Sequence, residues 1–490
     1  MNFKYKFKGL LSVTNIFLLP FFFVLHGYRS NAPLVSIKDA VILFLEYLIG
    51  FLVIYLFVSK YMKSSKKASF LTMFLMCIFF FFGWMHDLEK KVLHNSFLSR
   101  YSLIIPVLII SVVLIIRLIK KSKFSFSKPS QYFNVLFSIL IIIEIGFLLK
   151  NSISKKEPYV HFIVQDKGAP KPDVYFIVSD GYAGQEELRN ILNYDNSVFL
   201  DQLKSKGFHI VSNSRSNYNL TPFSLASTLK MDYLTLNSFN ENPEDLNNCF
   251  KNINSNEVIH FFKKTGYELV NYSIFQFDET PPLITSQFFE VGPGLIHSQT
   301  ILGRIEKDLF FNLITKYKFK WAMKIAVKKE VKKTEQLYQK TLAAANKKCN
   351  HPRFVYTHLM MPHYPYYLDS NGHFNDYNSI LEANWASKDG YINYLKYCNN
   401  KLLKLVDHIL QNSEYPPIII LLGDHGFREF STQPSIRKYY FMNLNAIYLP
   451  NKNYSCFKQG LSNVNEFRCL FNTAFNQNYD IKTDSTIFIK

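Results

Sequence analysis

Two apolar runs in the second half of the sequence each lead into residues that can bind a metal. Asp180 lies two residues after the run 174–178, and Asp424 lies two residues after the run 417–422, with His425 next to it. Such runs, bounded by turn residues, are typical of strands buried on both faces of an α/β sheet, whose ligands bind at the carboxyl ends of the strands. Carboxylate with imidazole suits zinc or manganese. The pattern makes all three residues candidate metal ligands, although Asp-Gly alone is also a common turn.

A third strand-like run, residues 354–357, continues into a loop rich in His and Pro. His363 lies in this loop between two prolines, which restrict the backbone and could present the imidazole to a ligand. His358 directly follows the run. Two interpretations of His358 stay open: a second metal ligand, or a neutral imidazole buried in the strand.

Thr221 and Pro222 begin a predicted helix. Thr at the N-cap followed by Pro at the first helical position is a common helix start, and capping alone would explain the pair. A hydroxyl there also points toward the free N–H groups and the positive end of the helix dipole. That position favours an attacking oxyanion and a bound phosphate. Thr221 is therefore a candidate nucleophile.

The domain that must position these residues occupies only part of the chain. Residues 1–150 are dominated by Phe, Leu and Ile in long runs, whereas later residues mix apolar and polar types. The sequence predicts a transmembrane domain over residues 1–150, a polar linker over residues 151–172, and an α/β catalytic domain over residues 173–490.

The first part contains segments long and apolar enough to cross roughly 30 Å of hydrocarbon. We expect five transmembrane helices, at residues 10–25, 40–59, 69–85, 103–119 and 133–149. Twelve Lys and Arg residues lie in the amino-terminal tail and the second and fourth loops, against five in the alternate loops. The positive-inside rule then predicts a cytoplasmic amino terminus and an extracytoplasmic catalytic domain.

Two carboxylates lie inside the predicted spans. Glu46 is six residues into the second span, and Glu144 is five residues before the end of the fifth. Both would lie roughly 8 to 9 Å below the outer surface, at about 1.5 Å per residue. Two interpretations stay open: carboxylates that reach interfacial water, or a polar cavity for a lipid headgroup or carrier.

The distribution of charge argues against nucleic acid as a partner. The chain has 56 Lys and Arg against 37 Asp and Glu, but residues 1–150 alone hold 18 against 5. Most of the excess therefore flanks the membrane spans, whereas a nucleic-acid footprint would lie on the folded domain. The catalytic part has five cysteines and no CxxC pair, which allows at most two disulfides and is compatible with an oxidising compartment.

The order of these motifs resembles the alkaline phosphatase superfamily, in particular its sulfatase-like branch with lipoteichoic acid synthases, phosphoethanolamine transferases and nucleotide pyrophosphatase/phosphodiesterases. In that superfamily an acid closes the first strand, a Thr, Ser or modified Cys nucleophile opens the next helix, and a late Asp-His completes the metal site. A closer resemblance, over residues 171–490, is to bacterial membrane proteins of the sulfatase-like group. It is carried by residues 180–182, 227–234, 358–363, 423–426, 445–450 and 463–468.

The resemblance implies an alkaline-phosphatase-like, mostly parallel central sheet flanked by helices. It also implies a divalent metal, manganese, zinc or magnesium in preference to calcium. The implied ligands are Asp180, Thr221, Asp424 and His425, with His358 as a candidate ligand of a second site.

The implied catalytic residues are Thr221, His363 and Arg428. A bound cation would lower the pKa of the Thr221 hydroxyl, which would attack phosphorus and form a covalent intermediate. His363 would contact the substrate phosphate, as a comparable His does in lipoteichoic acid synthases. Together with Arg428 it would orient the phosphate or protonate the leaving group. Arg428 could also be an ordinary surface cation.

The sequence departs from the sulfatases at the nucleophile. Sulfatases modify a Cys or Ser in a Cys-x-Pro-x-Arg motif to formylglycine, whereas residues 221–225 here are Thr-Pro-Phe-Ser-Leu. Phosphoryl transfer is therefore expected in preference to sulfate hydrolysis.

The function hypothesis is a phosphotransferase of the bacterial cytoplasmic (inner) membrane. It would move a phosphoglycerol or phosphoethanolamine type group from a lipid or lipid-linked donor to an envelope glycan or polysaccharide. The alternatives are a phosphodiester or sulfate ester hydrolase and, from another class, a catalytically idle sensor or scaffold that binds a polymer.

Overall fold

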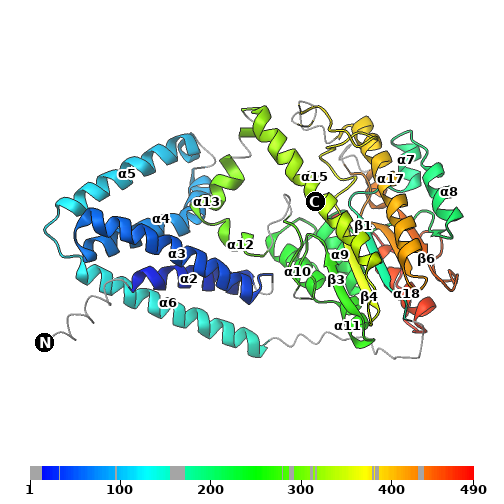
Figure 1. Ribbon diagram of the computed structural model, residues 1–490, viewed down its shortest axis with the longest axis horizontal. Helices are drawn as coiled ribbons and strands as arrows, with labels where there is room; N and C mark the ends of the chain where they lie inside the picture. The colour runs from blue at the N-terminus through cyan, green and yellow to red at the C-terminus, as the bar shows by residue number, and fades with distance from the viewer. Residues whose placement is uncertain are drawn as a thin grey trace. The chain divides into compact units, whose positions relative to one another are not determined.

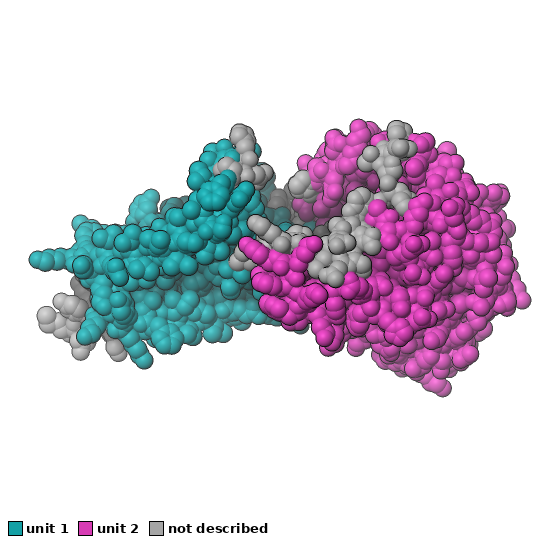
Figure 2. All heavy atoms as spheres, turned by 90° about the horizontal axis from the view of Figure 1, so that it is seen from above, with its two compact units in different colours: residues 1–159, 287–312 teal, residues 160–286, 313–490 magenta. Residues whose placement is uncertain are grey.

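The chain forms two compact units in a computed structural model. It describes residues 14–490 except 32–33, 94–96, 155–170, 279, 286–291, 310–312, 315–316, 378–379, 381–385 and 429–434. Unit 1 comprises residues 1–159 and 287–312, and unit 2 comprises residues 160–286 and 313–490 (Figure 2). Residues 287–312, which the sequence-based division places in the catalytic domain, thus group with the first unit. Most of the predicted linker, residues 155–170, lies outside the described residues.

Unit 1 is built from long helices (Figure 1). They are α2 (Asn15–Asn31), α3 (Ile37–Met62), α4 (Ser65–Val92), α5 (Tyr101–Lys121) and α6 (Ser127–Ser154), with a 3-10 turn η1 (Phe97–Ser99). In the described part of the chain, α3 to α6 are long and apolar enough to cross a membrane. These four contain the second to fifth predicted spans. The first prediction stays open, because α2 has 17 described residues and residues 10–13 lie outside the description.

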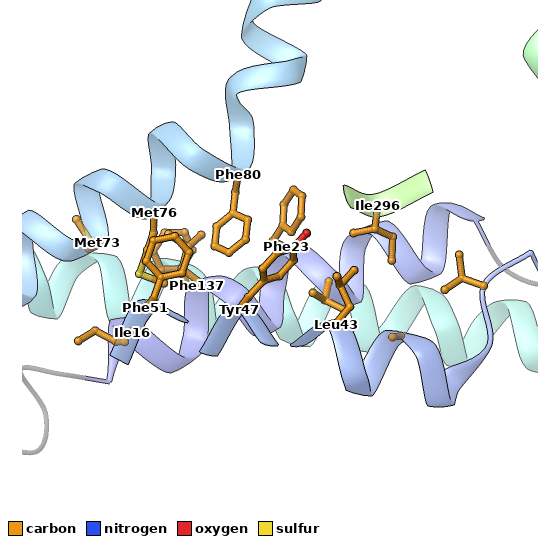
Figure 3. Close-up of a cluster of buried hydrophobic side chains, with 14 residues drawn as sticks. Ile16, Phe23, Leu43, Tyr47, Phe51, Met73, Met76, Phe80, Phe137 and Ile296 are labelled. Atoms are coloured by element: carbon orange, nitrogen blue, oxygen red, sulfur yellow. The ribbon is translucent and has the colours of Figure 1, made fainter. Parts of the chain in front are cut away.

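Aromatic side chains fill the interior of unit 1 (Figure 3). The ring centroid of Phe80 lies 4.5 Å from that of Phe23, 5.1 Å from that of Tyr47 and 5.4 Å from that of Phe51. These four rings come from α2, α3 and α4, so edge and face contacts among them hold the three helices together. Burial of this much aromatic surface explains why the Phe-rich runs form a packed unit.

The two carboxylates of the predicted spans have different surroundings. Glu144 is buried, with Oε1 at 2.8 Å from Nδ1 of His26 and Oε2 in an ion pair with Arg29. Glu46 is exposed on the surface of α3. A buried charge in a membrane helix needs a partner, and Glu144 has two.

Unit 1 also contains three short helical segments from the second half of the chain. They are α12 (Gly294–His297), α13 (Ile301–Arg304) and the π-helical turn η2 (Ile305–Leu309). Ile296 of α12 belongs to the same buried cluster as Phe23 and Phe80 (Figure 3).

Unit 2 contains a six-stranded sheet in its described residues. The strands are β1 (Val174–Ser179), β2 (His209–Ile210), β3 (Glu268–Tyr272), β4 (Arg353–Leu359), β5 (Ile418–Gly423) and β6 (Asn445–Tyr448), in the order β2-β6-β5-β1-β4-β3. β1 pairs in parallel with β4 and β5, and β3 in parallel with β4. β6 runs antiparallel to β5 and β2. This mostly parallel sheet confirms the predicted fold class.

Helices cover both faces of the sheet. They include α7 (Gln185–Asn190), α8 (Ser197–Ser205), α9 (Thr221–Lys230), α10 (Pro243–Asn254), α11 (Glu257–Lys264), α15 (Lys320–Asn346), α17 (Lys388–Asn412) and α18 (Glu466–Ala474), with 3-10 turns η4 (Arg437–Phe441) and η5 (Asn463–Asn465). Phe176 contacts Phe467 of α18, and the Thr357 hydroxyl bonds that of Thr341 in α15. Phe176 and Ile177 are adjacent in β1, so their side chains point to opposite faces of the sheet. Thr357 pairs with Ile177 and shares its face, so the contacts with α18 and α15 lie on opposite faces. Every residue of β1, β4 and β5 is accordingly buried.

Cys456 and Cys469 form a disulfide in unit 2. The other four cysteines are free thiols. Disulfides persist in oxidising compartments, so the bond agrees with the predicted extracytoplasmic side.

Candidate functional site

The carboxyl ends of three neighbouring strands bring the predicted ligands together. Ser179 at the end of β1 is paired with Leu359 of β4 and Gly423 of β5. The next residues after β1 and β5 are Asp180 and Asp424, which therefore leave the sheet side by side. His358 lies one residue before the end of β4. The structure thus has the predicted ligands Asp180, His358 and Asp424 at the carboxyl ends of three neighbouring strands.

The ligand atoms of these residues form two overlapping groups. Asp180, His363 and His425 offer atoms within 4.8 Å of one another, and so do Asp180, His358 and Asp424. Nε2 of His425 lies 3.7 Å from Oδ1 of Asp180 and 3.5 Å from Oδ2 of Asp424. Nε2 of His358 lies 3.3 Å from Oδ2 of Asp180. Asp180 therefore belongs to both groups.

Two buried carboxylate oxygens in this site have no hydrogen-bond donor, Oδ1 of Asp180 and Oδ2 of Asp424. The other oxygen of Asp424 accepts hydrogen bonds from the backbone N–H groups of Gly181 and His425, at 2.9 and 3.0 Å. Burying two carboxylates side by side is unfavourable unless positive charge compensates them. The unsatisfied oxygens and the oxygen and nitrogen donor set fit a divalent metal.

Two of the imidazoles are oriented by their own backbone. Nδ1 of His425 donates to the carbonyl oxygen of Gly426 at 2.7 Å, and Nδ1 of His363 donates to that of Tyr364 at 2.5 Å. Such bonds fix the orientation of each ring. In His425 the bond leaves Nε2 as the atom without a proton, which is the form that coordinates a metal. His363 and His425 face the site with ring centroids 6.2 Å apart.

The electrostatics of the site keep its members in metal-binding protonation states. Burial raises the pKa of Asp180, but the imidazoles of His363, His358 and His425 lower it by more than burial raises it. The carboxylate therefore stays ionised. Burial lowers the pKa of His425 more than the neighbouring carboxylates of Asp424 and Asp180 raise it. Its imidazole is therefore neutral near pH 7, as metal binding requires.

Thr221 lies in the site, but the predicted capping position is wrong by one residue. The N-cap of α9 is Leu220, with φ −117° and ψ 136°, and Thr221 is the first helical residue. Its side chain therefore caps no N–H group of the helix. Instead, Oγ1 of Thr221 lies 3.3 Å from Nε2 of His425. Ser224, one turn later, donates to the carbonyl oxygen of Asp424 at 2.5 Å and joins α9 to the end of β5.

His363 and Arg428 are the predicted site residues that are only partly buried. Nη1 of Arg428 donates to the carbonyl oxygen of Asn219 at 2.7 Å, which holds the guanidinium close to the start of α9. Its charge helps to lower the pKa of His425. Both side chains are thus placed where a ligand could reach the metal-binding group.

Two supporting residues were not found from the sequence. The buried carboxylate of Glu187 accepts a hydrogen bond from the backbone N–H of Phe427 at 3.0 Å, and burial raises its pKa well above the ordinary value. The Tyr391 hydroxyl donates to the carbonyl oxygen of Gly181 and accepts from the N–H of Ala183. These bonds hold the loops after β5 and β1. Neither residue has a local motif, so no sequence signal would have revealed it.

The chain is similar to a known protein family and to several solved structures. The profile of the Sulfatase family matches residues 172–464. No curated protein matches the sequence. Among solved structures, the chain is similar to the zinc complex of the C-terminal periplasmic domain of EcEptC from Escherichia coli. That match has 9% identity, covers 64% of this chain and 84% of that chain, and has a TM-score of 0.39.

Two further structures show comparable similarity. The C-terminal periplasmic domain of phosphoethanolamine transferase EptC from Campylobacter jejuni has 16% identity, with 66% of this chain and 95% of that chain covered and a TM-score of 0.37. An alkaline phosphatase superfamily protein from Vibrio parahaemolyticus has 13% identity, with 62% and 66% covered and a TM-score of 0.38.

The family match spans more than half of the chain and includes β1, the start of α9 and the end of β5. It confirms the sulfatase-like resemblance expected from the motifs. The chain belongs to the Sulfatase family.

Proposed function

We propose that this enzyme is a membrane-anchored, metal-dependent phosphotransferase with Thr221 as its nucleophile. The observation that carries the proposal is the contact of the Thr221 hydroxyl with Nε2 of His425, which in turn lies beside the buried carboxylates of Asp180 and Asp424. Those three residues and Thr221 would hold the metal, with His358 as a candidate ligand of a second site. When bound, a divalent cation would lower the pKa of the Thr221 hydroxyl and neutralise charge on the phosphate oxygens.

In the first step, Oγ1 of Thr221 attacks phosphorus of the donor. A P–O bond to Thr221 forms, the P–O bond to the donor alcohol breaks, and the hydroxyl proton of Thr221 passes to solvent. His363 protonates the departing alkoxide, and Arg428 holds the phosphate oxygens. The first amide N–H groups of α9 favour the negative charge at this position.

In the second step, a hydroxyl of the acceptor attacks the same phosphorus. His363 takes the acceptor's proton, the bond from phosphorus to Oγ1 breaks, and Thr221 is regenerated. Water in place of the acceptor would give hydrolysis instead of transfer. The choice between the two outcomes is therefore set by which hydroxyl reaches the intermediate.

The membrane helices and the Thr221 motif support the proposed substrates. Four helices of membrane length anchor the described part of the chain, so the enzyme works beside a lipid surface. A donor in that surface would be a phospholipid or a lipid-linked compound that carries a phosphoglycerol or phosphoethanolamine group. The acceptor would be an envelope glycan, with the catalytic part on the extracytoplasmic side of the bacterial cytoplasmic membrane. Thr221 stands where sulfatases need a modified Cys or Ser, which favours phosphate over sulfate esters.

Labelled lipids test the proposal. The full chain, reconstituted with Mn²⁺ or Zn²⁺ in vesicles of headgroup-labelled phosphatidylglycerol or phosphatidylethanolamine, is incubated with and without envelope glycan. We expect the label to move from the lipid to the glycan in the reaction that contains glycan, and to stay in the lipid in the reaction without it. Label that reaches only water-soluble products would replace the transferase with the hydrolase. No turnover of any lipid or sulfate ester would favour the idle scaffold.

A further inference from the structure

Residues 292–309 belong in sequence to the catalytic half of the chain but pack within the helical unit. They lie between β3 and α15, both of which are in unit 2, yet the segment groups with unit 1. The chain thus leaves unit 2, contacts the membrane helices through α12, α13 and η2, and returns to unit 2. We call residues 292–309 the docking segment.

Two glycines of the membrane helices accommodate the docking segment. A Cβ atom at Gly27 of α2 would lie 2.9 Å from both γ-carbons of Ile296, and one at Gly83 of α4 would lie 2.7 Å from the backbone oxygen of Gln299. The N–H of Gly83 donates to that same oxygen at 2.8 Å. Ile296 is 1% exposed and packs in the aromatic cluster (Figure 3). With the facing residues unchanged, a larger residue at either glycine would displace the segment.

Polar contacts add specificity to this packing. The Tyr47 hydroxyl lies 2.8 Å from Nδ1 of His297, with the two rings stacked. Arg304 forms an ion pair with Asp87 of α4. The hydroxyl of Tyr101, the first residue of α5, donates to Asp308. Shape-matched glycines, hydrogen bonds and an ion pair on four helices are more than incidental contact requires.

The contacted positions share one side of the predicted membrane topology. Gly27 lies in the last turns of α2, Asp87 near the end of α4, Tyr101 at the start of α5, and Tyr47 in the first half of α3. With a cytoplasmic amino terminus, all four lie toward the extracytoplasmic surface. The catalytic half is predicted on that side, so the segment reaches the helices without crossing the membrane.

We propose that the docking segment positions the catalytic part for reaction with a donor embedded in the membrane, with Ile296 and Arg304 as positioning residues. The proposal rests on the proposed function for the nature of the donor. A phosphate at headgroup level meets the nucleophile productively only if the catalytic part is kept near that level, and a second attachment raises the frequency of such encounters. A donor dissolved in water needs no such attachment.

A disulfide tests the docking itself. A Cβ at position 27 would lie 3.3 Å from that of Ile296, close to the spacing in disulfides. Gly27→Cys with Ile296→Cys should cross-link on oxidation, in a background where the partly exposed Cys77 and Cys349 are Ser. Gly50→Cys with Ile296→Cys is the control, because a Cβ at Gly50 has no atom within 4 Å. Absence of the linked peptide from the first pair by mass spectrometry, or equal linking in the control, would overturn the docking.

A charge exchange tests the positioning role. Arg304→Asp should lower kcat/KM at least about tenfold for a labelled phospholipid in vesicles, yet change it less than about twofold for a water-soluble nitrophenyl phosphodiester. Asp87→Arg should behave alike, and the double variant should regain the vesicle activity. This rescue would show that neither single variant acts by misfolding.

The outcomes separate this inference from the proposed function. Single variants with undiminished activity on vesicles, or an equal loss on both substrates, would overturn the positioning role while the transferase stands. A wild-type protein that turns over neither substrate would overturn the proposed function and the positioning role together. The disulfide result decides the docking in either case.

Discussion

Oγ1 of Thr221 lies 3.3 Å from Nε2 of His425, although 204 residues separate them in sequence. Thr221 starts α9 and His425 follows β5, so the contact requires the helix start to meet the carboxyl edge of the sheet. The bond from Ser224 to the backbone of Asp424 holds this meeting point together. The proposed nucleophile and the predicted metal ligands are thus held together by contacts within the folded domain.

Replacing Thr221 should remove catalysis and leave the fold intact. Thr221→Ala should lower the transfer rate by at least about a thousandfold, because the covalent step would lose its nucleophilic oxygen. Thr221→Ser should keep measurable activity. Mass spectrometry of quenched wild-type reactions should find the transferred phosphoryl group on the peptide that contains Thr221.

Thr228→Ala is the matched control for Thr221. Thr228 is buried in the same helix, but its hydroxyl donates to the backbone of Ser224 rather than to the site. Its loss should affect thermal stability more than turnover. Full activity of Thr221→Ala would exclude Thr221 as the nucleophile.

Removing one acid of the site should release the metal. Asp424→Asn should lower the metal content of the purified protein, measured by plasma mass spectrometry, because one of two buried carboxylates is lost. After chelation the same change should make the protein more stable than the wild type. The wild type then has two buried carboxylates with no cation between them, whereas the variant has one. Asp201→Asn, at an exposed position, should alter neither quantity. Unchanged metal content in Asp424→Asn would show that the ion binds elsewhere.

The role of His363 can be separated from metal binding by the choice of leaving group. If His363 protonates the departing alkoxide, His363→Gln should slow the turnover of an alkyl phosphodiester by roughly a hundredfold or more. The turnover of a nitrophenyl phosphodiester, whose leaving group needs no proton, should fall far less. The exposed His373→Gln is the control. Equal losses on both substrates would assign His363 to binding instead.

Glu466 should make the stability of the folded protein fall between mildly acidic and neutral pH. Burial raises its pKa to about 7, and the hydrogen bond from Asn445 opposes this only in part. The folded state therefore favours the protonated carboxyl, and stability falls as the pH rises from about 4.5 through 7. Ionisation of Glu466 would cost up to about 3 kcal/mol of unfolding free energy.

Glu466→Gln should remove this dependence and retain the bond to Asn445. Its unfolding temperature, relative to the wild type, should rise more at pH 8 than at pH 5. The exposed Glu414→Gln should show no such difference. A uniform shift at both pH values would mean that Glu466 does not titrate in this range.

The sequence was most informative where chemistry coincides with a local pattern. The strands that carry Asp180, His358 and Asp424 are continuous apolar runs, and the structure has all three as buried parallel strands. The four spans within α3 to α6 were predictable for the same reason, because hydrophobic length is a local property. The catalytic and ligand roles of the site residues stay predictions, since the structure shows their positions only.

Features that depend on tertiary contacts could not be predicted. Leu220 rather than Thr221 lies at the N-cap, and Oγ1 of Thr221 contacts His425, from the far end of the domain sequence. Glu187 and Tyr391 support the site through backbone groups that a sequence does not identify. Ile296 lies in a short segment with no pattern of its own, and only Gly27 and the aromatic cluster show where it packs.

The docking segment also matters for how the enzyme is produced. A soluble fragment that begins after residue 170 would include residues 292–309 but none of the helices that cover them. Ile296 would then face water instead of Phe23 and Phe80, and the fragment would tend to self-associate. Replacing residues 287–312 with a short Gly-Ser connection should give a better-behaved secreted enzyme for crystallisation and inhibitor screening.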